Sequence, residues 1–209
     1  MSSPSRLVEI LHNKGELAPE WAPTVAAVDR AHFVPDTFEV ADRTVSRSAD
    51  EAEWRRMVYA DLPLITQHND GRRTAGEVTF PTCSTSMPSL MLAMAAVVRD
   101  GDTVLEVGTG TGYHAAWLAH RLGGDRTTTI ETDKDLHDIA RDNLTRAGLH
   151  PTRSAATAWR ASPRGPPSTG SSRPARSATS PTPGWSRPYR AARSSPRGAP
   201  RSTPIRSPP

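Results

Sequence analysis

A short apolar run followed by three alternate glycines limits this chain to a small set of folds. The segment VLEVGTGTGY at residues 104–113 has glycines at 108, 110 and 112, and an amphipathic run continues to Leu122. Glycine has no Cβ, so the backbone can turn sharply out of a strand and approach a ligand closely. The apolar spacing after Tyr113 indicates a helix whose free N–H groups point at that ligand. The sequence therefore predicts a strand, a glycine loop and a helix that together bind a nucleotide-like cofactor.

The spacing of the glycines distinguishes between classes of cofactor. A dinucleotide site needs G-x-G-x-x-G, and Tyr113 stands where the third glycine belongs, which disfavours an NAD-dependent oxidoreductase. The spacing E-x-G-x-G-x-G resembles that of S-adenosylmethionine (AdoMet) methyltransferases. A second predicted strand, 127–130, ends at Glu131, about 20 residues past the loop, where Rossmann-like sites place the acid that binds ribose hydroxyls. The alternative is a glycine-rich turn in an unrelated α/β domain. The expected AdoMet-binding residues are Glu106, Gly108, Thr109, Gly110, Thr111, Gly112 and Glu131.

The order of the predicted elements indicates the fold class. Helices are expected before the glycine-loop strand, and a helix follows each of the two strands. This order is the first half of a doubly wound sheet, so we expect an incomplete, Rossmann-like α/β fold with an N-terminal helical region. The last helix should face inward through Leu136, Ile139, Ala140 and Leu144. The predicted helices span residues 6–14, 20–30, 88–97, 113–122 and 134–147.

Composition divides the chain near residue 151. Residues 152–209 contain 11 Arg, 12 Pro and 12 Ser but no Lys, Asp or Glu, so this tail carries +11 while residues 1–151 carry −7. Because so few large apolar side chains are present, the tail cannot offset its chain entropy and is expected to be disordered. We therefore expect a helical, substrate-side region at 1–83, half of an AdoMet-binding domain at 84–150 and a disordered Arg/Ser/Pro-rich tail at 151–209.

The remaining residue types exclude several classes of protein. A single cysteine, Cys83, rules out an internal disulfide and fits a reducing compartment. We find no signal peptide and no apolar run long enough to span a bilayer, so we expect a cytoplasmic protein without a membrane partner. No histidine pair has metal-ligand spacing with a carboxylate or cysteine partner, so no metal is expected.

Four segments resemble one known family. FVP at 33–35, YADLPL at 59–64, STSMP at 84–88 and the glycine loop occur in the order and spacing seen in protein-L-isoaspartate O-methyltransferases, and the resemblance covers roughly residues 20–150. The chain is particularly similar to the branch that accompanies ATP-grasp enzymes in ribosomal peptide maturation. The resemblance implies AdoMet-dependent methyl esterification of an isoaspartyl or aspartyl carboxylate on a protein or peptide, with an ATP-grasp-modified peptide as one candidate partner.

The resemblance also implies one catalytic residue. In the family, a hydroxyl in the segment that matches 84–88 lies beside the substrate carboxylate, and the matching residue here is Ser86. Such a hydroxyl can orient one carboxylate oxygen while the other attacks, in a reaction where positioning lowers most of the barrier. The alternative is that Ser86 only caps the helix that begins at Pro88.

Two interpretations of the tail differ in what they imply. A basic tail on a degenerate Rossmann fragment would bind nucleic acid through phosphate contacts. We favour a frameshift near 151–154 and do not expect nucleic acid as a partner. If each triplet starts on the third base of the printed codon, 155–161 can read GDGLAG and 166–192 can read PPFDRVIATCSVRDIPYTWVEQTVPGG. We therefore expect a truncated methyltransferase that is unstable and weakly active or inactive as printed.

Overall fold

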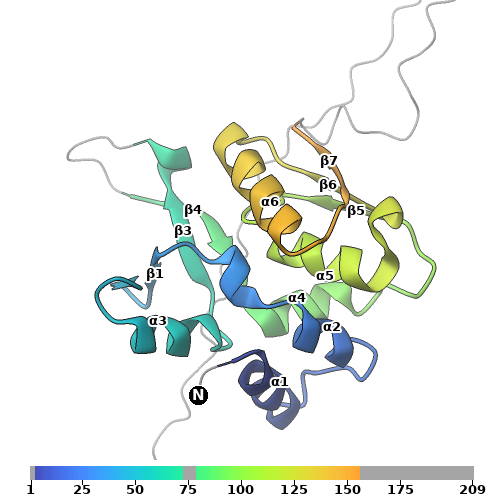
Figure 1. Cartoon of the computed structure of the whole chain (residues 1–209), viewed down its shortest axis with the longest axis horizontal. Helices are drawn as coiled ribbons and strands as arrows, with labels where there is room; N and C mark the ends of the chain where they lie inside the picture. The colour runs from blue at the N-terminus through green and yellow to red at the C-terminus, as the bar shows by residue number, and fades with distance from the viewer. Residues whose placement is uncertain (1–2, 73–78, 156–209) are drawn as a thin grey trace, which may run out of the picture. The chain divides into compact units, whose positions relative to one another are not determined.

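Two short helices and a 3-10 turn begin the described part of the chain, which comprises residues 3–72 and 79–155 of this computed structural model (Figure 1). Helices α1 (Pro4–Asn13) and α2 (Ala22–Ala27) pack together, and η1 (Arg30–Phe33) follows. The helix expected over 20–30 is shorter than predicted because Val28 is already extended, with φ −89° and ψ 97°. Of the expected tail, residues 156–209 lie outside the described residues.

An antiparallel sheet occupies part of the region 1–83, which was expected to be helical. Its strand order is β2-β1-β3-β4, and α3 (Glu51–Val58) separates β2 from β3. The helical interpretation of 1–83 is therefore wrong for these segments, and its boundary at 83 falls within a strand. The strands have only four or five residues each, which is too short for an alternating pattern to stand out. The four are β1 (Thr37–Val40), β2 (Arg43–Ser46), β3 (Leu64–His68) and β4 (Pro81–Thr85).

A second, parallel sheet carries the predicted glycine-loop strand. Its order is β5-β6-β7, with β5 at Val104–Val107, β6 at Thr127–Ile130 and β7 at Thr152–Ser154 (Figure 1). Parallel neighbours need crossover connections, which α5 (Tyr113–Leu122) and α6 (Lys134–Arg146) provide. The α/β fold is thus confirmed. β7 is an additional strand, because the sequence had indicated only two in this sheet and had placed residues 152–154 in the disordered tail; that expectation is wrong for these three residues, which pair with β6.

The helices after β4 follow the predicted boundaries closely. α4 begins at Pro88, as expected, and ends at Ala95. Two further elements are single 3-10 turns: η2 (Asn69–Gly71) lies before β4, and η3 (Gly124–Arg126) lies before β6. On α6, three of the four residues expected to face inward are buried, but Ile139 is 46% exposed. No helix among the described residues is both long and apolar enough to cross a membrane.

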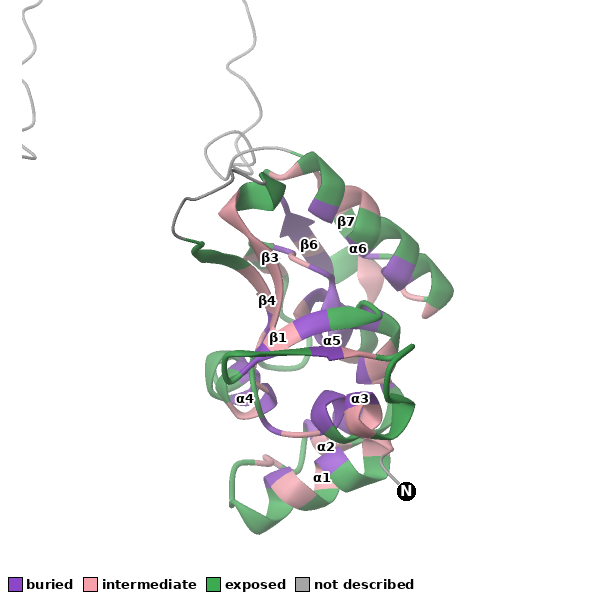
Figure 2. Cartoon of the chain, turned by 90° about the vertical axis from the view of Figure 1, so that its left-hand side faces the viewer, coloured by how far each residue is buried: buried purple, intermediate pink, exposed green. Residues whose placement is uncertain are grey.

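An aromatic cluster anchors the glycine-loop helix in the core. The ring of Tyr113 lies 5.2 Å from that of Trp117 and 5.5 Å from that of Phe33, and the Trp117 ring lies 6.4 Å from that of Trp21. All four side chains are at most 2% exposed. Figure 2 colours the buried positions of the chain purple. Aromatic pairs of this kind stabilise beyond their buried area. The first turn of α5 is therefore held firmly beneath the loop that precedes it.

Candidate cofactor-binding site

A pocket of about 560 Å³ lies at the carboxyl ends of β5 and β6, next to β4. In open α/β sheets this edge of the strands is where ligands bind. The glycine loop, the segment Ser84–Ser86 and the residues after β6 contribute to its lining. The pocket thus brings Ser86 together with every expected cofactor residue except Gly112.

The last two loop glycines are required for different reasons. Gly110 has φ +56°, and a Cβ there would stand 3.2 Å from the Cys83 sulfur atom. Gly112 has φ +96° and is the N-cap of α5, and a Cβ there would stand 3.3 Å from Leu144 Cγ on α6. Both positions lie in the left-handed region that side chains disfavour. Gly112 is not part of the pocket lining, but its missing side chain lets the start of α5 lie close to Leu144 of α6.

Glu131 joins the end of β6 to the glycine loop. One carboxylate oxygen accepts a hydrogen bond from the Gly110 N–H at 2.8 Å. The other accepts from the N–H groups of Thr132 at 2.7 Å and Asp133 at 3.0 Å. The residue is only 7% exposed. Its carboxylate is therefore held in a fixed orientation at the pocket wall.

Glu106 belongs to a hydrogen-bonded chain of side chains. Its Oε1 lies 3.0 Å from His114 Nδ1, and its Oε2 accepts from the Thr129 hydroxyl at 2.5 Å. That hydroxyl lies 2.6 Å from the hydroxyl of Thr109. Two expected residues, Glu106 and Thr109, are thus linked through a strand residue that sequence reasoning did not select.

His114 is a pocket residue that the sequence analysis did not assign to the site. It lines the pocket from the first turn of α5, and its Nε2 is buried without a hydrogen-bond partner among the described residues. Buried nitrogens without a partner are rare in folded proteins. The sequence signal that could have identified His114 was its position in the first turn of α5, where it can reach Glu106 on β5.

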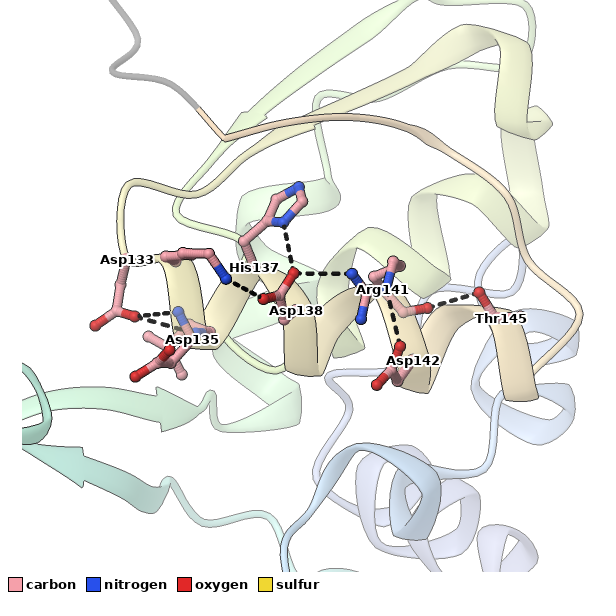
Figure 3. Close-up of polar contacts among 9 residues, drawn as sticks. Asp133, Asp135, His137, Asp138, Arg141, Asp142 and Thr145 are labelled. Carbon is pink, nitrogen blue, oxygen red and sulfur yellow. Dashed lines mark hydrogen bonds and ion pairs between the residues drawn. The ribbon is translucent and has the colours of Figure 1, made fainter.

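Acidic side chains dominate the charge of the pocket lining. Asp70, Glu106, Glu131 and Asp133 all contribute, whereas no Lys or Arg does so among the lining residues that the structure describes. A hydrogen bond from Gln67, followed by one from the Leu136 N–H, lowers the pKa of Asp133, so this group is ionised at neutral pH. Figure 3 shows Asp133 capping the first turn of α6. The pocket therefore favours a cationic ligand over an anionic one.

The neighbourhood of Ser86 tests one of its two predicted roles, that of a helix cap. Ser86 is half-buried and lines the pocket. The N-cap of α4 is Met87, and no N-cap side chain bonds to the helix, whereas Asp61 accepts from the Ser89 N–H at 2.8 Å. The interpretation of Ser86 as the cap is therefore wrong. Thr85 is buried and lies 3.2 Å, hydroxyl to hydroxyl, from Thr111, so its side chain is used to join β4 to the loop.

A buried arginine fixes the backbone on both sides of Ser86. Arg30 is 1% exposed and donates to five carbonyl oxygens at 2.8 to 3.0 Å. Burial lowers the pKa of its guanidinium to about 10, so it stays charged at neutral pH. Because the contacts are distant in sequence, the residue types alone did not reveal this role. The five acceptors belong to Val58, Ala60, Leu62, Thr85 and Ser86.

Within the described ranges, no group of three or more His, Cys, Asp or Glu side chains is arranged to hold a metal ion.

Solved structures share the fold. A protein-L-isoaspartate O-methyltransferase matches with a TM-score of 0.51 at 24% identity, over 72% of this chain and 41% of its own. A putative protein-L-isoaspartate O-methyltransferase from Plasmodium falciparum, in complex with S-adenosyl-L-homocysteine, matches with a TM-score of 0.53 at 17% identity, over 76% of this chain and 65% of its own. At these identities, the likeness supports the arrangement of the elements.

Sequence relatives carry one common description. The protein-L-isoaspartate O-methyltransferase of Ignicoccus hospitalis is 39% identical over 134 residues, which are 63% of this chain and 50% of the relative. That of Hyperthermus butylicus is 32% identical over 152 residues, 68% of this chain and 52% of the relative. The chain thus spans about half the length of the curated relatives it matches.

A family model matches residues 2–158, which include both sheets and the whole pocket. This range covers about three quarters of the chain. The expectation from the four sequence segments is confirmed at the level of the family. The chain belongs to the protein-L-isoaspartate(D-aspartate) O-methyltransferase family.

Proposed function

We propose that the pocket binds AdoMet and that the chain carries the cofactor half of a carboxyl O-methyltransferase for isoaspartyl or aspartyl carboxylates of a protein or peptide. The observation that carries this proposal is the acidic pocket at the glycine loop. AdoMet has a sulfonium and an ammonium against one carboxylate, so its net charge is positive. The pyrophosphate of NAD would meet four acidic residues without a described Lys or Arg in the lining. The relative that was solved with S-adenosyl-L-homocysteine supports the same choice.

The residues of the pocket suit AdoMet in shape and in donors. The glycine loop leaves room for a ligand to approach the backbone, and a Cβ at Gly108 would meet open space. Glu131 is the candidate acceptor for the ribose hydroxyls, in exchange for its contact with the Gly110 N–H. Glu106 and the free Nε2 of His114 offer polar partners to the charged end of the ligand.

The chemistry makes few demands on acid–base groups. AdoMet supplies an electrophilic methyl group, and a carboxylate is already an anionic nucleophile at neutral pH, so no general base is required. The task of the protein is to hold the two reactants in line and to exclude water. We assign to Ser86 the hydroxyl that donates to the carboxylate oxygen that does not attack, because Ser86 shares the pocket with the glycine loop.

We also propose which part of the chain supplies the substrate side of the site and which supplies the cofactor side. Residues 1–83 would supply the substrate side and 84–150 the cofactor side, with β4 joining them. As printed, the chain spans about half the length of its relatives, and we expect methyl transfer to be weak or absent. The free thiol of Cys83, whose pKa is raised by burial, suits a cytoplasmic setting.

A methyl-transfer assay tests the reaction class. The chain is incubated with methyl-tritiated AdoMet and an isoaspartyl peptide, and base-labile methyl groups are counted. We expect any transfer to go to the free carboxylate and to fall at least roughly 100-fold in Ser86→Ala, the loss typical of one transition-state donor. Ser48→Ala, an exposed hydroxyl outside the pocket, is the matched control. Base-stable labelling, or equal labelling of a peptide with blocked carboxyls, would contradict the proposal.

The same assay addresses the substrate. An aspartyl peptide modified by an ATP-grasp enzyme is compared with the isoaspartyl peptide at equal concentration. We propose that the damaged aspartyl residue is the general substrate, and the ATP-grasp-modified peptide a special one. Preference for the modified peptide by more than tenfold would reverse that order.

A further inference from the structure

The hydrogen-bond ladder between β3 and β4 is irregular where it reaches the cofactor pocket. Beyond Ile65, an extra residue on β3, Thr66, precedes the pair formed by Gln67 and Cys83, and an extra residue on β4, Thr82, separates that pair from the next one. Neighbouring residues of a regular strand point to opposite faces, yet Thr82 and Cys83 both line the pocket. Bulges of this kind redirect side chains and are frequent beside active sites. The irregular ladder thus brings Gln67 and Thr82 to the pocket wall together.

The side-chain amide of Gln67 joins two parts of the fold. Its Nε2 donates to Asp133 Oδ2 at 3.0 Å, and its Oε1 accepts from the Thr82 hydroxyl at 3.0 Å. The Thr82 oxygen also accepts from the Asp70 N–H at 3.0 Å. Because an ionised carboxylate only accepts, Asp133 fixes which end of the amide faces α6. Within residues 3–72 and 79–155, the bond to Asp133 is the one hydrogen bond between the antiparallel sheet and α6 with its N-cap.

The two carboxylate oxygens of Asp133 have separate partners. Oδ1 accepts from the N–H groups of Asp135 at 2.8 Å and Leu136 at 3.1 Å, which caps α6 (Figure 3). Oδ2 accepts from Gln67. Since the hydrogen bond from Gln67 lowers the pKa of Asp133, it favours the charged carboxylate. A change at Gln67 therefore removes the hold on Asp133 and leaves the cap of α6 in place.

Asp133 is in turn bonded to the acid that we assign to the ribose. Its N–H donates to Glu131 Oε1 at 3.0 Å, and Glu131 Oε2 accepts from the Gly110 N–H at 2.8 Å. Gly110 also lies against β4, because a Cβ there would stand 3.2 Å from the Cys83 sulfur atom. Cys83 is the ladder partner of Gln67. Five lining residues thus form a closed ring of contacts within the pocket wall: Gln67, Asp133, Glu131, Gly110 and Cys83.

We propose that Gln67 is a positioning residue for the cofactor, which holds Asp133, and through it the Glu131 carboxylate, in the orientation that receives the adenosine end of AdoMet. This inference rests on the proposed function, because it takes AdoMet as the ligand and Glu131 as the acceptor for its ribose hydroxyls. The cofactor residues expected from the sequence all lie between positions 106 and 131, whereas Gln67 belongs to β3. The antiparallel sheet therefore supports cofactor binding, in addition to the substrate side proposed for it.

Three ligands that share an adenosine group test the proposal by binding alone. AdoMet, S-adenosyl-L-homocysteine and 5′-methylthioadenosine are titrated into the wild-type chain and into Gln67→Leu, and the backbone amide of Gly108 is followed by NMR. We expect Gln67→Leu to weaken the binding of all three roughly fivefold, because the lost hydrogen bond acts at the adenosine end that the ligands share. Equal affinities of the two chains, or a loss for AdoMet alone, would overturn the proposal.

His68→Leu is the matched control. His68 is the next residue of β3, its Nε2 lies 3.4 Å from Glu39 Oε2, and it lies outside the lining of the cofactor pocket. The affinities of this variant should equal those of the wild type. A loss as large as that of Gln67→Leu would assign the effect to the sheet as a whole and overturn the proposal. Failure of all three ligands to bind the wild-type chain would instead overturn the proposed function, and this inference with it.

Gln67→Glu separates positioning from a defect in folding, because one variant is compared in two protonation states. When ionised, a glutamate at position 67 repels the Asp133 carboxylate, and when protonated it can donate to that carboxylate as the amide does. Neighbouring acids raise the pKa of such a group, so it gains its proton as the pH falls from about 8 to about 5. The carboxyl, thiol and imidazole groups that share the pocket lining with it are Asp70, Cys83, Glu106, His114, Glu131 and Asp133.

Each variant is compared with the wild type at the same pH, because those neighbouring groups are common to both. At about pH 8, Gln67→Glu should bind 5′-methylthioadenosine, which carries no charge, roughly tenfold more weakly than the wild type, and near pH 5 the difference should shrink below about threefold. The difference for Gln67→Leu should stay constant, since leucine does not titrate. A difference for Gln67→Glu that is the same at both pH values, or that grows toward the lower one, would overturn the proposal.

Discussion

At the scale of single residues, buried charges organise the site. Arg30 bonds to five carbonyl oxygens, and two of these belong to Thr85 and Ser86 at the pocket wall. A buried charge is tolerated when hydrogen bonds compensate it, and the two terminal nitrogens of Arg30 serve all five acceptors, while its Nε has no partner among the described residues. The position of Ser86 therefore depends on a residue 56 positions earlier in the chain.

Arg30→Lys should destabilise the fold. An ammonium has only three donors, so at least two of the five carbonyls, all of them buried or partly buried, lose their partner. We expect the free energy of unfolding to fall by about 3 kcal/mol in urea titrations. Arg56→Lys, at an arginine whose side chain is 61% exposed beside Glu53, should change it by less than about 0.5 kcal/mol. Equal effects of the two changes would contradict the role of Arg30.

Asp61 should make stability depend on pH. Burial tends to raise its pKa, but the hydrogen bonds from Lys14 and the Ser89 N–H outweigh burial and lower the pKa below its usual value. A carboxyl with a lowered folded-state pKa stabilises above its unfolded pKa of about 3.9, and the contribution is lost as pH falls through the folded value. Asp61→Asn should therefore cost about 1 to 2 kcal/mol at pH 7.

The variant Asp61→Asn also tests the direction in which stability changes with pH. Unfolding free energies of wild type and Asp61→Asn are compared at pH 7 and near pH 2. The difference should shrink at the lower pH, because protonated Asp61 has lost its charge-assisted bonds. A difference that is constant across this range would show that the carboxylate charge contributes nothing.

Motif residues could be predicted from the sequence, and their partners could not. Glu106, the loop glycines and Glu131 follow from local spacing, and the pocket places all but Gly112 in its lining. Arg30, His114 and Thr129 matter through contacts that only the folded chain creates. The role of Ser86 as a helix cap was wrong because a distant carboxylate, Asp61, serves that helix instead.

At the scale of elements, long periodic segments were predictable and short strands were not. The bounds of β5, α5 and β6 agree with the sequence pattern, since each is flanked by glycine or by an acid. β1 and β2 were missed because their turn uses Ala41 and Asp42 at φ 48° and 58°, where glycine or asparagine would have signalled a hairpin. The fold class therefore followed from the cofactor half alone.

The junction between the glycine loop and its helix offers a prediction at this scale. Gly112→Ala introduces a side chain at φ +96°, 3.3 Å from Leu144 Cγ. Gly101→Ala is the matched control, because its φ is +89° and a Cβ there meets open space. Backbone strain alone should lower the free energy of unfolding by about 1 to 2 kcal/mol in each variant. The contact with Leu144 should lower it by about 1 kcal/mol more in Gly112→Ala. Thermal melts measure both, and equal shifts would show that α5 and α6 need no close approach.

At the scale of the whole molecule, the chain combines a packed core with an open sheet. Trp21, Trp54 and Trp117 are at most 1% exposed, yet Val107 at the pocket and Val97 after α4 remain open to solvent. Because folded domains are only marginally stable, exposed apolar surface of this kind weakens the cooperative transition. We therefore expect the printed chain to bind AdoMet more weakly than its full-length relatives do, through the same residues.

The most direct test of the central claim is an NMR titration of the printed chain that follows the backbone amides of Gly108 and Gly110. AdoMet should shift these amides with an affinity weaker than micromolar, NAD should leave them unchanged, and Glu131→Gln should weaken AdoMet binding roughly tenfold, about 1.4 kcal/mol. Asp138→Asn, at an acid of α6 that pairs with Lys134 and Arg141 outside the pocket, should leave binding unchanged (Figure 3). Tighter binding of NAD than of AdoMet, or AdoMet binding that is unaffected by Glu131→Gln, would contradict the account.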